Sequence, residues 1–190
     1  YGKFFPGYNL CWLKKEQVNK NYTILRSAVM SNNRSSSIKK IIHYISFFIS
    51  AVINSFKVKN FDLLIISSPP IFTGLIGFIQ KKIRKKDYWL DVRDLWPESI
   101  ASLVSSERSL FYKIGKFIEK IIYSNAKGLI TPVPGFKNYF KENHASKNKP
   151  KLVLMNGLSS DFLKKINETK SSAQEQFTVF FSGNFGLAQS

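Results

Sequence analysis

Short apolar runs alternate with helical patterns through the middle of the chain. Residues 61–67 (FDLLIIS) are apolar almost throughout and end at a pair of prolines, as expected for a strand buried on both faces of a parallel sheet. Further strand-like runs are 87–92, 127–131 and 151–155. Helical spacing is found in 71–83, 109–123 and 134–143. Strands and helices that alternate at this spacing predict an α/β fold, a parallel sheet with helices on both faces.

Two of the predicted helices have a defined apolar pattern. In 109–123 the residues expected to line one buried side are Leu110, Ile114, Phe117, Ile118, Ile121 and Ile122. The segment 41–56 is apolar but contains serines, a histidine and an asparagine, and it is shorter than the roughly 20 apolar residues needed to span a bilayer. It fits a core helix with an exposed basic rim, which we favour, or a helix lying in a membrane interface.

The pattern changes towards the end of the chain. Residues 163–176 are polar and predict a linker with room for a short surface helix, and 177–182 (FTVFFS) again resemble a buried strand. We therefore expect an α/β domain over 1–162, incomplete at its start, and a linker over 163–176. Residues 177–190 would be the first strand and glycine loop of a second domain, so that the chain is a fragment truncated at both ends.

The composition is that of a globular protein with few residues suited to bind metal. The chain has 190 residues, 44% of them hydrophobic and 22% charged, which is typical of a globular protein. One cysteine and two histidines exclude a disulfide scaffold and leave little from which to build a zinc site, so we predict no metal.

The charge is strongly positive. Lys and Arg total 29 against 12 Asp and Glu, a net charge of +17, and no acidic residue occurs between Gln17 and Phe61. Such a balance indicates an anionic partner, or simply a lysine-rich composition with solvated side chains. Nucleic acid is the weaker candidate, because the chain contains no zinc finger, arginine-rich arm or aromatic-glycine RNA-binding motif.

Open parallel sheets bind ligands beyond the carboxyl ends of their strands, which directs attention to three segments. The first is Ser67-Ser68-Pro69-Pro70, a stiff exit from a strand. Ser67 and Ser68 could offer hydroxyls to a polar ligand there, although a simple turn would have the same sequence.

The second segment, LDVRDLWPE at 90–98, is the most specific. Strand alternation places Asp91 and Arg93 on one side, and because buried charges need partners, an ion pair of Arg93 with Asp91 or Asp94 is expected. Asp94 could alternatively cap a helix that starts at Pro97 and Glu98. Otherwise Asp91, Arg93 and Asp94 form a carboxylate site that takes a hydroxyl proton or holds sugar hydroxyls.

The third segment, SGNFG at 182–186, combines a strand end with glycines. Glycine permits close approach of the backbone to a phosphate, so Gly183, Asn184 and Gly186 are candidate phosphate-binding residues.

Several motifs in series suggest a family. The motifs are SPP, DVRDLWPES, LITPVPGFKNYF, NGLSSDF and FFSGNFGLAQ, together with YGKFFPGY at the start and the basic-aromatic segment 33–50. In this order and spacing they resemble the family-4 glycosyltransferases of the GT-B fold. The similar branch makes bacterial surface polysaccharides and transfers residues such as N-acetyl-fucosamine.

The resemblance implies two Rossmann-like domains that face each other across a cleft, of which this chain holds the acceptor side. It implies transfer of a sugar from a nucleotide-sugar, with a UDP-sugar the expected co-substrate and no covalently bound cofactor. The expected catalytic residues are Asp94, Asp91 and Arg93. The expected substrate-binding residues are Ser67, Ser68, Trp96, Glu98 and Asn156, and the donor phosphate would lie on Gly183, Asn184 and Gly186.

The chain departs from the family pattern at two places. A His-Asp pair is common in relatives where Arg93-Asp94 stands here, and because arginine stays protonated, any base role shifts to Asp94 or Asp91. Met155 replaces the usual proline before Asn156-Gly157, and no acidic residue follows that glycine. As half of a cleft, the chain is expected to be inactive by itself.

The resemblance also implies a polyprenyl-diphosphate-linked or other saccharide acceptor. The protein would then lie on the cytoplasmic face of the bacterial membrane, bound peripherally to an anionic surface and not to nucleic acid. The expected docking residues are Lys39, Lys40, Phe47, Phe48, Phe56, Lys57 and Lys59. Two alternatives remain: a Rossmann-type oxidoreductase or epimerase, and a basic membrane- or nucleic-acid-binding module without catalysis.

Overall fold

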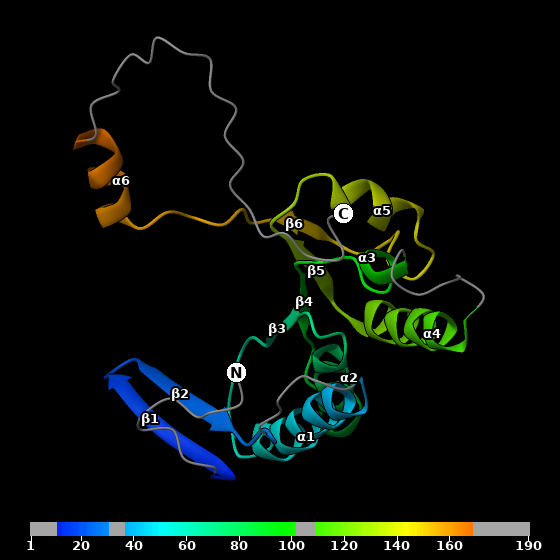
Figure 1. The fold of residues 1–190 in the computed structure, drawn as a ribbon, viewed down its shortest axis with the longest axis horizontal. Helices are drawn as coiled ribbons and strands as arrows, with labels where there is room; N and C mark the ends of the chain where they lie inside the picture. The colour runs from blue at the N-terminus through cyan, green and yellow to red at the C-terminus, as the bar shows by residue number, and fades with distance from the viewer. Residues whose placement is uncertain (1–10, 31–36, 102–108, 169–190) are drawn as a thin grey trace.

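The fold is of the α/β class, built on a parallel sheet flanked by helices (Figure 1). The computed structural model describes residues 11–30, 37–101 and 109–168, so the segment expected to start a second domain lies outside it. Four parallel strands pair in the order β3-β4-β5-β6. They are β3 (Ile65–Ser68), β4 (Trp89–Val92), β5 (Gly128–Thr131) and β6 (Lys151–Val153). The Rossmann-like class predicted from the sequence is thus confirmed.

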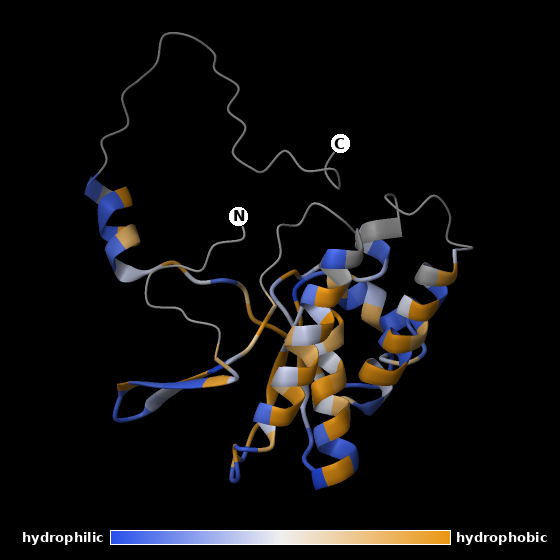
Figure 2. Ribbon diagram, turned by 60° about the horizontal axis from the view of Figure 1, so that its bottom comes forward, coloured by the Kyte–Doolittle hydropathy of each residue, from blue (hydrophilic) through white to orange (hydrophobic). Residues whose placement is uncertain are grey.

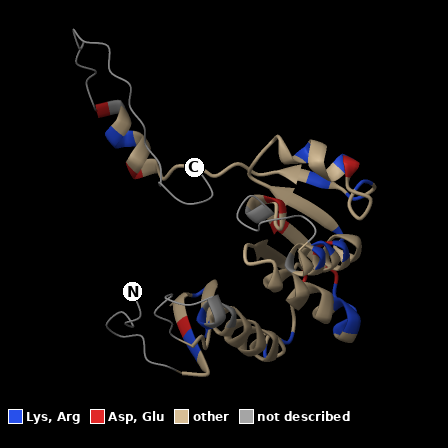
Figure 3. Ribbon diagram, turned by 45° about the vertical axis from the view of Figure 1, so that its right-hand side comes forward, with Lys and Arg blue, Asp and Glu red and all other residues tan. Residues whose placement is uncertain are grey.

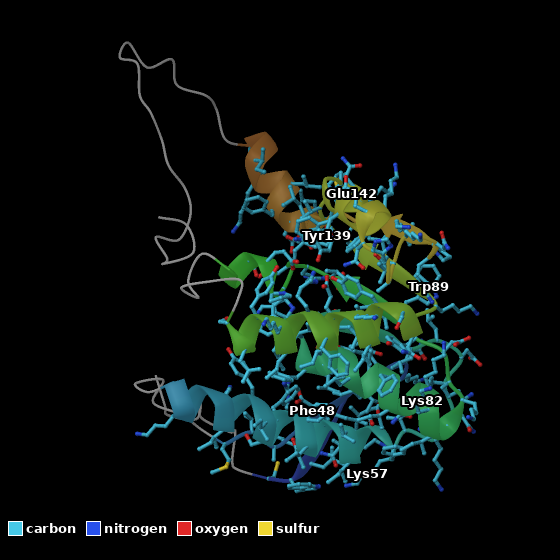
Figure 4. All side chains as sticks on the ribbon, turned by 90° about the vertical axis from the view of Figure 1, so that its right-hand side faces the viewer. Phe48, Lys57, Lys82, Trp89, Tyr139 and Glu142 are labelled. Carbon is cyan, nitrogen blue, oxygen red and sulfur yellow. The ribbon has the colours of Figure 1, made fainter. Side chains whose placement is uncertain are left out.

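Helices connect the strands at the predicted places. The connecting helices are α2 (Phe72–Arg84), α3 (Glu98–Ala101), α4 (Leu110–Asn125) and α5 (Phe136–Glu142). A longer helix, α1 (Ser37–Ser55), precedes β3 and packs beside α2, which in turn packs against α4. Figure 4 looks onto this layer of helices, where α1, α2 and α4 lie side by side.

The core lies between this helical layer and one side of the sheet. Tyr88, Leu90 and Val92 are fully buried there, and the Tyr88 hydroxyl donates to the carbonyl of Ile122 at 2.6 Å. Gly77 lets α2 approach the Tyr88 ring closely. On the other side of the sheet Leu63 and Ile65 remain 60% and 50% exposed, so apolar burial is strongest where α2 and α4 pack.

A β-hairpin that the sequence analysis did not predict precedes α1. It consists of β1 (Leu13–Asn19) and β2 (Tyr22–Ser27), paired antiparallel, and stands apart from the main sheet (Figure 1). The buried Asn54 of α1 donates to the carbonyl of Trp12 at 2.9 Å and to Ser27 Oγ at 3.1 Å. Ser50 Oγ donates to the carbonyl of Ala28. These contacts explain why polar residues interrupt the apolar pattern of α1.

Helix α1 overlaps the predicted segment 41–56 and packs through Ser50 and Asn54, but Ile42, Ile45, Ile49 and Ile53 stay 44–48% exposed, so the choice between a core helix and an interfacial helix stays open. Among the residues that the structure describes, no helix combines the length and the apolar character needed to cross a bilayer.

The buried side of α4 differs from the prediction. Ile118 and Ile122 face the core as expected, but Leu110, Ile114 and Phe117 are 73%, 49% and 64% exposed. The apolar stripe of α4 is wider than the surface that α2, α5 and the sheet can cover, so part of it faces solvent.

A last helix, α6 (Ser160–Glu168), begins just before the predicted linker and extends into it. Its side chains are exposed, including Phe162, Leu163 and Ile166, and it stands away from the α/β body (Figure 1). The predicted boundary between residues 162 and 163 thus falls inside a helix.

Candidate functional site

The centre of the candidate site is the carboxylate of Asp91, near the carboxyl end of β4. Ser67 and Asp91 are directly paired across β3 and β4, so their side chains lie on the same side of the sheet. Ser67 Oγ donates to Asp91 Oδ2 at 2.8 Å, and Arg93 Nε donates to the same oxygen at 2.8 Å. The ion pair predicted between Asp91 and Arg93 is confirmed.

The two charged groups differ in their access to solvent. The Asp91 side chain is 11% exposed and the Arg93 side chain 54% exposed. The buried carboxylate thus anchors the guanidinium through Nε, and the terminal nitrogens of Arg93 bond to no described residue. A planar guanidinium presented in this way can bind a phosphate or carboxylate with two hydrogen bonds.

The backbone supports this arrangement. The amide of Arg93 donates to the carbonyl of Ser68 at 3.0 Å, which continues the β3–β4 ladder by one residue. Arg93 is therefore held both by its side chain and by its main chain, directly beside the loop that leaves β3.

Asp94 is half-buried and follows Arg93 just beyond the carboxyl end of β4. Burial raises the pKa of Tyr123 well above its ordinary value, and the charges of Glu119, Glu98 and Asp94 contribute to this. Tyr123 belongs to the core against which Leu90 packs. Among the described residues no hydrogen bond from Asp94 caps α3, so its predicted cap role has no support there.

The two serines before the prolines point to different sides. Ser67 faces Asp91, whereas Ser68 pairs with Val92 and is buried. Because neighbouring residues of a strand alternate, the Ser68 side chain lies on the other side of β3 from Asp91, and its burial argues against a ligand contact; substrate binding by Ser67 stays a prediction.

Glu98 bonds to two neighbouring helices. Its Oε1 accepts from Lys116 Nζ at 2.6 Å and from the Tyr139 hydroxyl at 2.9 Å. Through Oε1 this carboxylate holds α3 against α4 and α5, whereas its Oε2 bonds to no described residue, so substrate binding by Glu98 stays a prediction. Trp96 is half-buried and packs on α4, where a Cβ added at Gly115 would lie 2.7 Å from its ring. Substrate binding by Trp96 stays a prediction.

The sequence analysis missed the polar cluster to which Glu98 belongs. We call it the Lys116 cluster, and it comprises Glu98, Lys116, Glu119, Tyr139 and Asn143. Lys116 also pairs with Glu119, which accepts from the Tyr139 hydroxyl. The only signal in the sequence was an acidic residue, Glu119, set among the apolar positions of a helix, three residues after Lys116.

Burial and pairing shift the titration of this cluster. Burial raises the pKa of Glu119, although hydrogen bonds from Lys116 and Tyr139 oppose the shift. Burial alone would lower the pKa of Lys116, but its hydrogen bonds to Glu119 and Glu98 raise it. Burial and the two carboxylates raise the pKa of the Tyr139 phenol, which stays protonated. Through Glu98, the cluster links the start of α3 to Lys116 of α4 and Tyr139 of α5.

The structure does not test the remaining predicted residues. Asn156 is exposed beyond β6, and Gly183, Asn184 and Gly186 lie outside the described residues. Among the described residues, no three His, Cys, Asp or Glu side chains come close enough to hold a metal ion.

The predicted docking residues divide into two groups. Lys39, Lys57 and Lys59 are exposed, while the side chain of Lys40 lies outside the described part of the chain. Phe47 lines an apolar cavity of about 380 Å³ together with Leu25 and Ile66. Phe48 and Phe56 are half-buried. Phe47 is itself half-buried and faces this cavity, so a membrane contact by its ring has no support, while docking by the other residues stays a prediction.

Comparison of the chain with known protein families, with curated proteins and with solved structures finds no match in any of the three.

Proposed function

We propose that the chain is the acceptor side of a glycosyltransferase, which moves a sugar from a nucleotide-sugar to a saccharide linked to a polyprenyl diphosphate. The observation that supports this most is the Asp91–Arg93 pair beside Ser67, at the carboxyl edge of a Rossmann-like sheet. Ligands of this fold class bind at that edge. The motif series around DVRDLWPES adds support from the sequence.

In the proposed reaction, the acceptor hydroxyl oxygen forms a bond to the anomeric carbon of the donor sugar. The bond from that carbon to the nucleoside diphosphate breaks, and the leaving diphosphate takes the electron pair. The hydroxyl proton passes to Asp94 or to the leaving phosphate. Arg93 cannot accept it, because a guanidinium remains protonated.

The roles proposed for the pair follow from its geometry. Arg93 binds a diphosphate oxygen through its terminal nitrogens, and Asp91 positions Arg93 through the 2.8 Å bond to Nε. Asp91 Oδ1, to which no described residue bonds, accepts a sugar hydroxyl. Ser67 keeps the carboxylate in place from β3.

We also propose that the protein works at the inner face of the bacterial membrane, where lipid-linked acceptors are found. The net charge of +17 supports attraction to anionic headgroups. Membrane attachment would keep the active edge of the sheet near an acceptor whose lipid remains in the bilayer.

Two measurements test the function. Calorimetric titration of this chain with a short-prenyl diphosphate-linked N-acetylhexosamine should give binding that Arg93→Gln weakens roughly tenfold or more, the value of a bidentate charged contact. Lys127→Gln, which removes an exposed cation near the opposite end of the strands, serves as the control and should leave binding unchanged. Equal binding by the two variants would refute the role of Arg93.

The transfer reaction is measured with the natural full-length protein, a UDP-sugar and the same acceptor. Asp91→Asn should lower the transfer rate, since Arg93 loses its anchor. If no nucleotide-sugar is consumed but a nicotinamide cofactor binds, the oxidoreductase alternative is correct.

A further inference from the structure

The outward side of the helical layer carries an unusual amount of apolar surface. On α1, one row of isoleucines recurs at helical spacing, and each is between 44% and 48% exposed: Ile42, Ile45, Ile49 and Ile53. On α4, the exposed Leu110, Ile114 and Phe117 form a second row. We call the two rows, with the helix α2 between them, the outer helical face.

The two rows belong to one surface. Helix α2 packs against both α1 and α4, and the view onto these helices shows them side by side (Figure 4). The rows lie mostly away from the packed sides of their helices, where Ser50 and Asn54 of α1 and Ile118 and Ile122 of α4 are buried. Ile49 also borders a hollow at the edge of the face, next to the segments that flank the hairpin. Hydrophobic stretches interrupted by hydrophilic positions are visible along these ribbons (Figure 2). Apolar surface of this extent on a folded protein indicates a docking site.

The charges around this face have one sign. Helices α1 and α2 contain no acidic residue, as Figure 3 shows, and the only acidic residue of α4, Glu119, is buried. Among the described side chains of these helices, the exposed cations are Lys39, Lys82, Lys113 and Lys120. Lys57 and Lys82 lie at the same end of the layer in Figure 4. An apolar face with a rim of lysines and no exposed carboxylate matches an anionic surface.

The chemistry favours a lipid surface over a second protein. Contact between two copies through this face would bring lysines opposite lysines, which opposes association. Protein interfaces are enriched in aromatic residues and arginine and depleted in lysine, whereas this face is aliphatic and lysine-rich. Amphipathic helices that lie in a membrane interface have this composition.

We propose that the outer helical face is the membrane-docking surface of the protein. The rows of α1 and α4 enter the boundary between headgroups and acyl chains, and the lysines bind lipid phosphates. The docking residues expected from the sequence included Phe47 and none from α4. This surface consists instead of isoleucines of α1 and of residues of α4, which lies far from α1 in the chain. The inference concerns membrane binding alone and does not depend on sugar transfer.

The test is sedimentation of the full chain with vesicles of phosphatidylglycerol and phosphatidylcholine in equal parts, without donor or acceptor. Ile49→Asn/Phe117→Asn should weaken binding at least tenfold. Val18→Asn/Met155→Asn replaces two apolar residues that are equally exposed but lie off the face, and should stay within twofold of wild type. Lys82→Glu/Lys120→Glu should weaken binding at least tenfold to these vesicles, and wild type should bind pure phosphatidylcholine poorly.

Circular dichroism melting checks that each variant is folded. If the apolar outer-face variant does not fold, Ile45→Ser/Ile114→Ser replaces it, and its vesicle binding is measured in the same way. Binding by the folded outer-face variants equal to wild type overturns the proposal. So does an absence of vesicle binding by wild type, or a wild-type dimer in sedimentation velocity that the outer-face variants convert to monomer. Loss of transferase activity with intact vesicle binding would refute the proposed reaction and leave this inference standing.

Discussion

Asp91 and Arg93 form an ion pair whose two members have very different surroundings. The bond from Arg93 Nε to Asp91 Oδ2 is 2.8 Å long, yet the carboxylate is 11% exposed and the guanidinium 54% exposed. If Asp91 is removed, water can solvate the Arg93 guanidinium. If Arg93 is removed, the buried Asp91 carboxylate stays poorly solvated. This asymmetry explains how a charge is tolerated in β4 between buried apolar residues.

The same asymmetry predicts unequal effects of substitution. Arg93→Ala leaves Asp91 with Ser67 alone and should lower the free energy of unfolding by about 1–3 kcal/mol. Asp91→Asn keeps a hydrogen-bonding side chain and should cost less, about 1 kcal/mol or below. Urea denaturation of both variants at neutral pH measures the difference. If Asp91→Asn proves the more damaging, the ion pair is not what stabilises the carboxylate.

A pH effect is predicted for Glu119. Burial raises its pKa in the folded chain above the ordinary value of 4.5, so the folded state binds this proton more tightly than the unfolded state. The contribution of Glu119 to stability therefore falls as pH rises from the ordinary pKa through the folded one. Glu119→Gln does not titrate, and its stability relative to wild type should improve over this window.

Urea denaturation of wild type and Glu119→Gln between about pH 4 and pH 8 checks this linkage. Glu142→Gln provides the control, since Glu142 is an exposed residue of α5. A relative stability of Glu119→Gln that declines with rising pH would show that pairing with Lys116 outweighs burial.

Gly77 is predicted to resist replacement by alanine. A Cβ there would lie 2.6 Å from the Tyr88 ring, and that ring is held by its hydroxyl bond to the Ile122 carbonyl. Alanine favours a helix by up to about 1 kcal/mol, but overpacking costs about 1–3 kcal/mol, so Gly77→Ala should be destabilising. Gly135→Ala, where a Cβ meets nothing within 4 Å, should change the melting temperature little. Equal melting of the two variants would contradict the tight packing of α2 on β4.

The hairpin should depend on Asn54. Asn54→Ala removes the hydrogen bonds to the Trp12 carbonyl and to Ser27 Oγ, and should destabilise the protein by about 1–3 kcal/mol. Amide hydrogen exchange should accelerate in residues 13–27 more than in β4. Asn60→Ala, at an exposed position after α1, is the matched control. Unchanged exchange in the hairpin would mean that other contacts attach it to α1.

The elements of the sheet were the most predictable part of the fold. The strand runs 61–67 and 87–92 and the helix 71–83 each overlap the observed β3, β4 and α2. Parallel strands form continuous apolar runs that stand out even without alternation, although burial on both faces was wrong for β3, where Ile65 is 50% exposed. The β1–β2 hairpin was missed for the opposite reason. Its strands are mostly exposed, and what attaches them is a side chain of α1, Asn54, more than 25 residues away.

The candidate site was predictable only where its residues are neighbours in the chain. Asp91 and Arg93 lie two residues apart, and strand alternation put them together with Ser67 expected nearby. The Lys116 cluster joins side chains from three helices, and its short contacts arise only after α3, α4 and α5 pack. The sequence could not show that Lys116 reaches Glu98.

By itself the amino-acid sequence determined the α/β class, the alternation of strands and helices in the parallel sheet, the charge, and the Asp91–Arg93 pair, because each depends on local periodicity or on residues close in the chain. Only the tertiary structure decided which side of each element is covered. That choice depends on the shape and size of neighbouring elements, which is why Ser68 faces the interior and Glu98 pairs with Lys116, while Ile49 and Phe117 remain exposed.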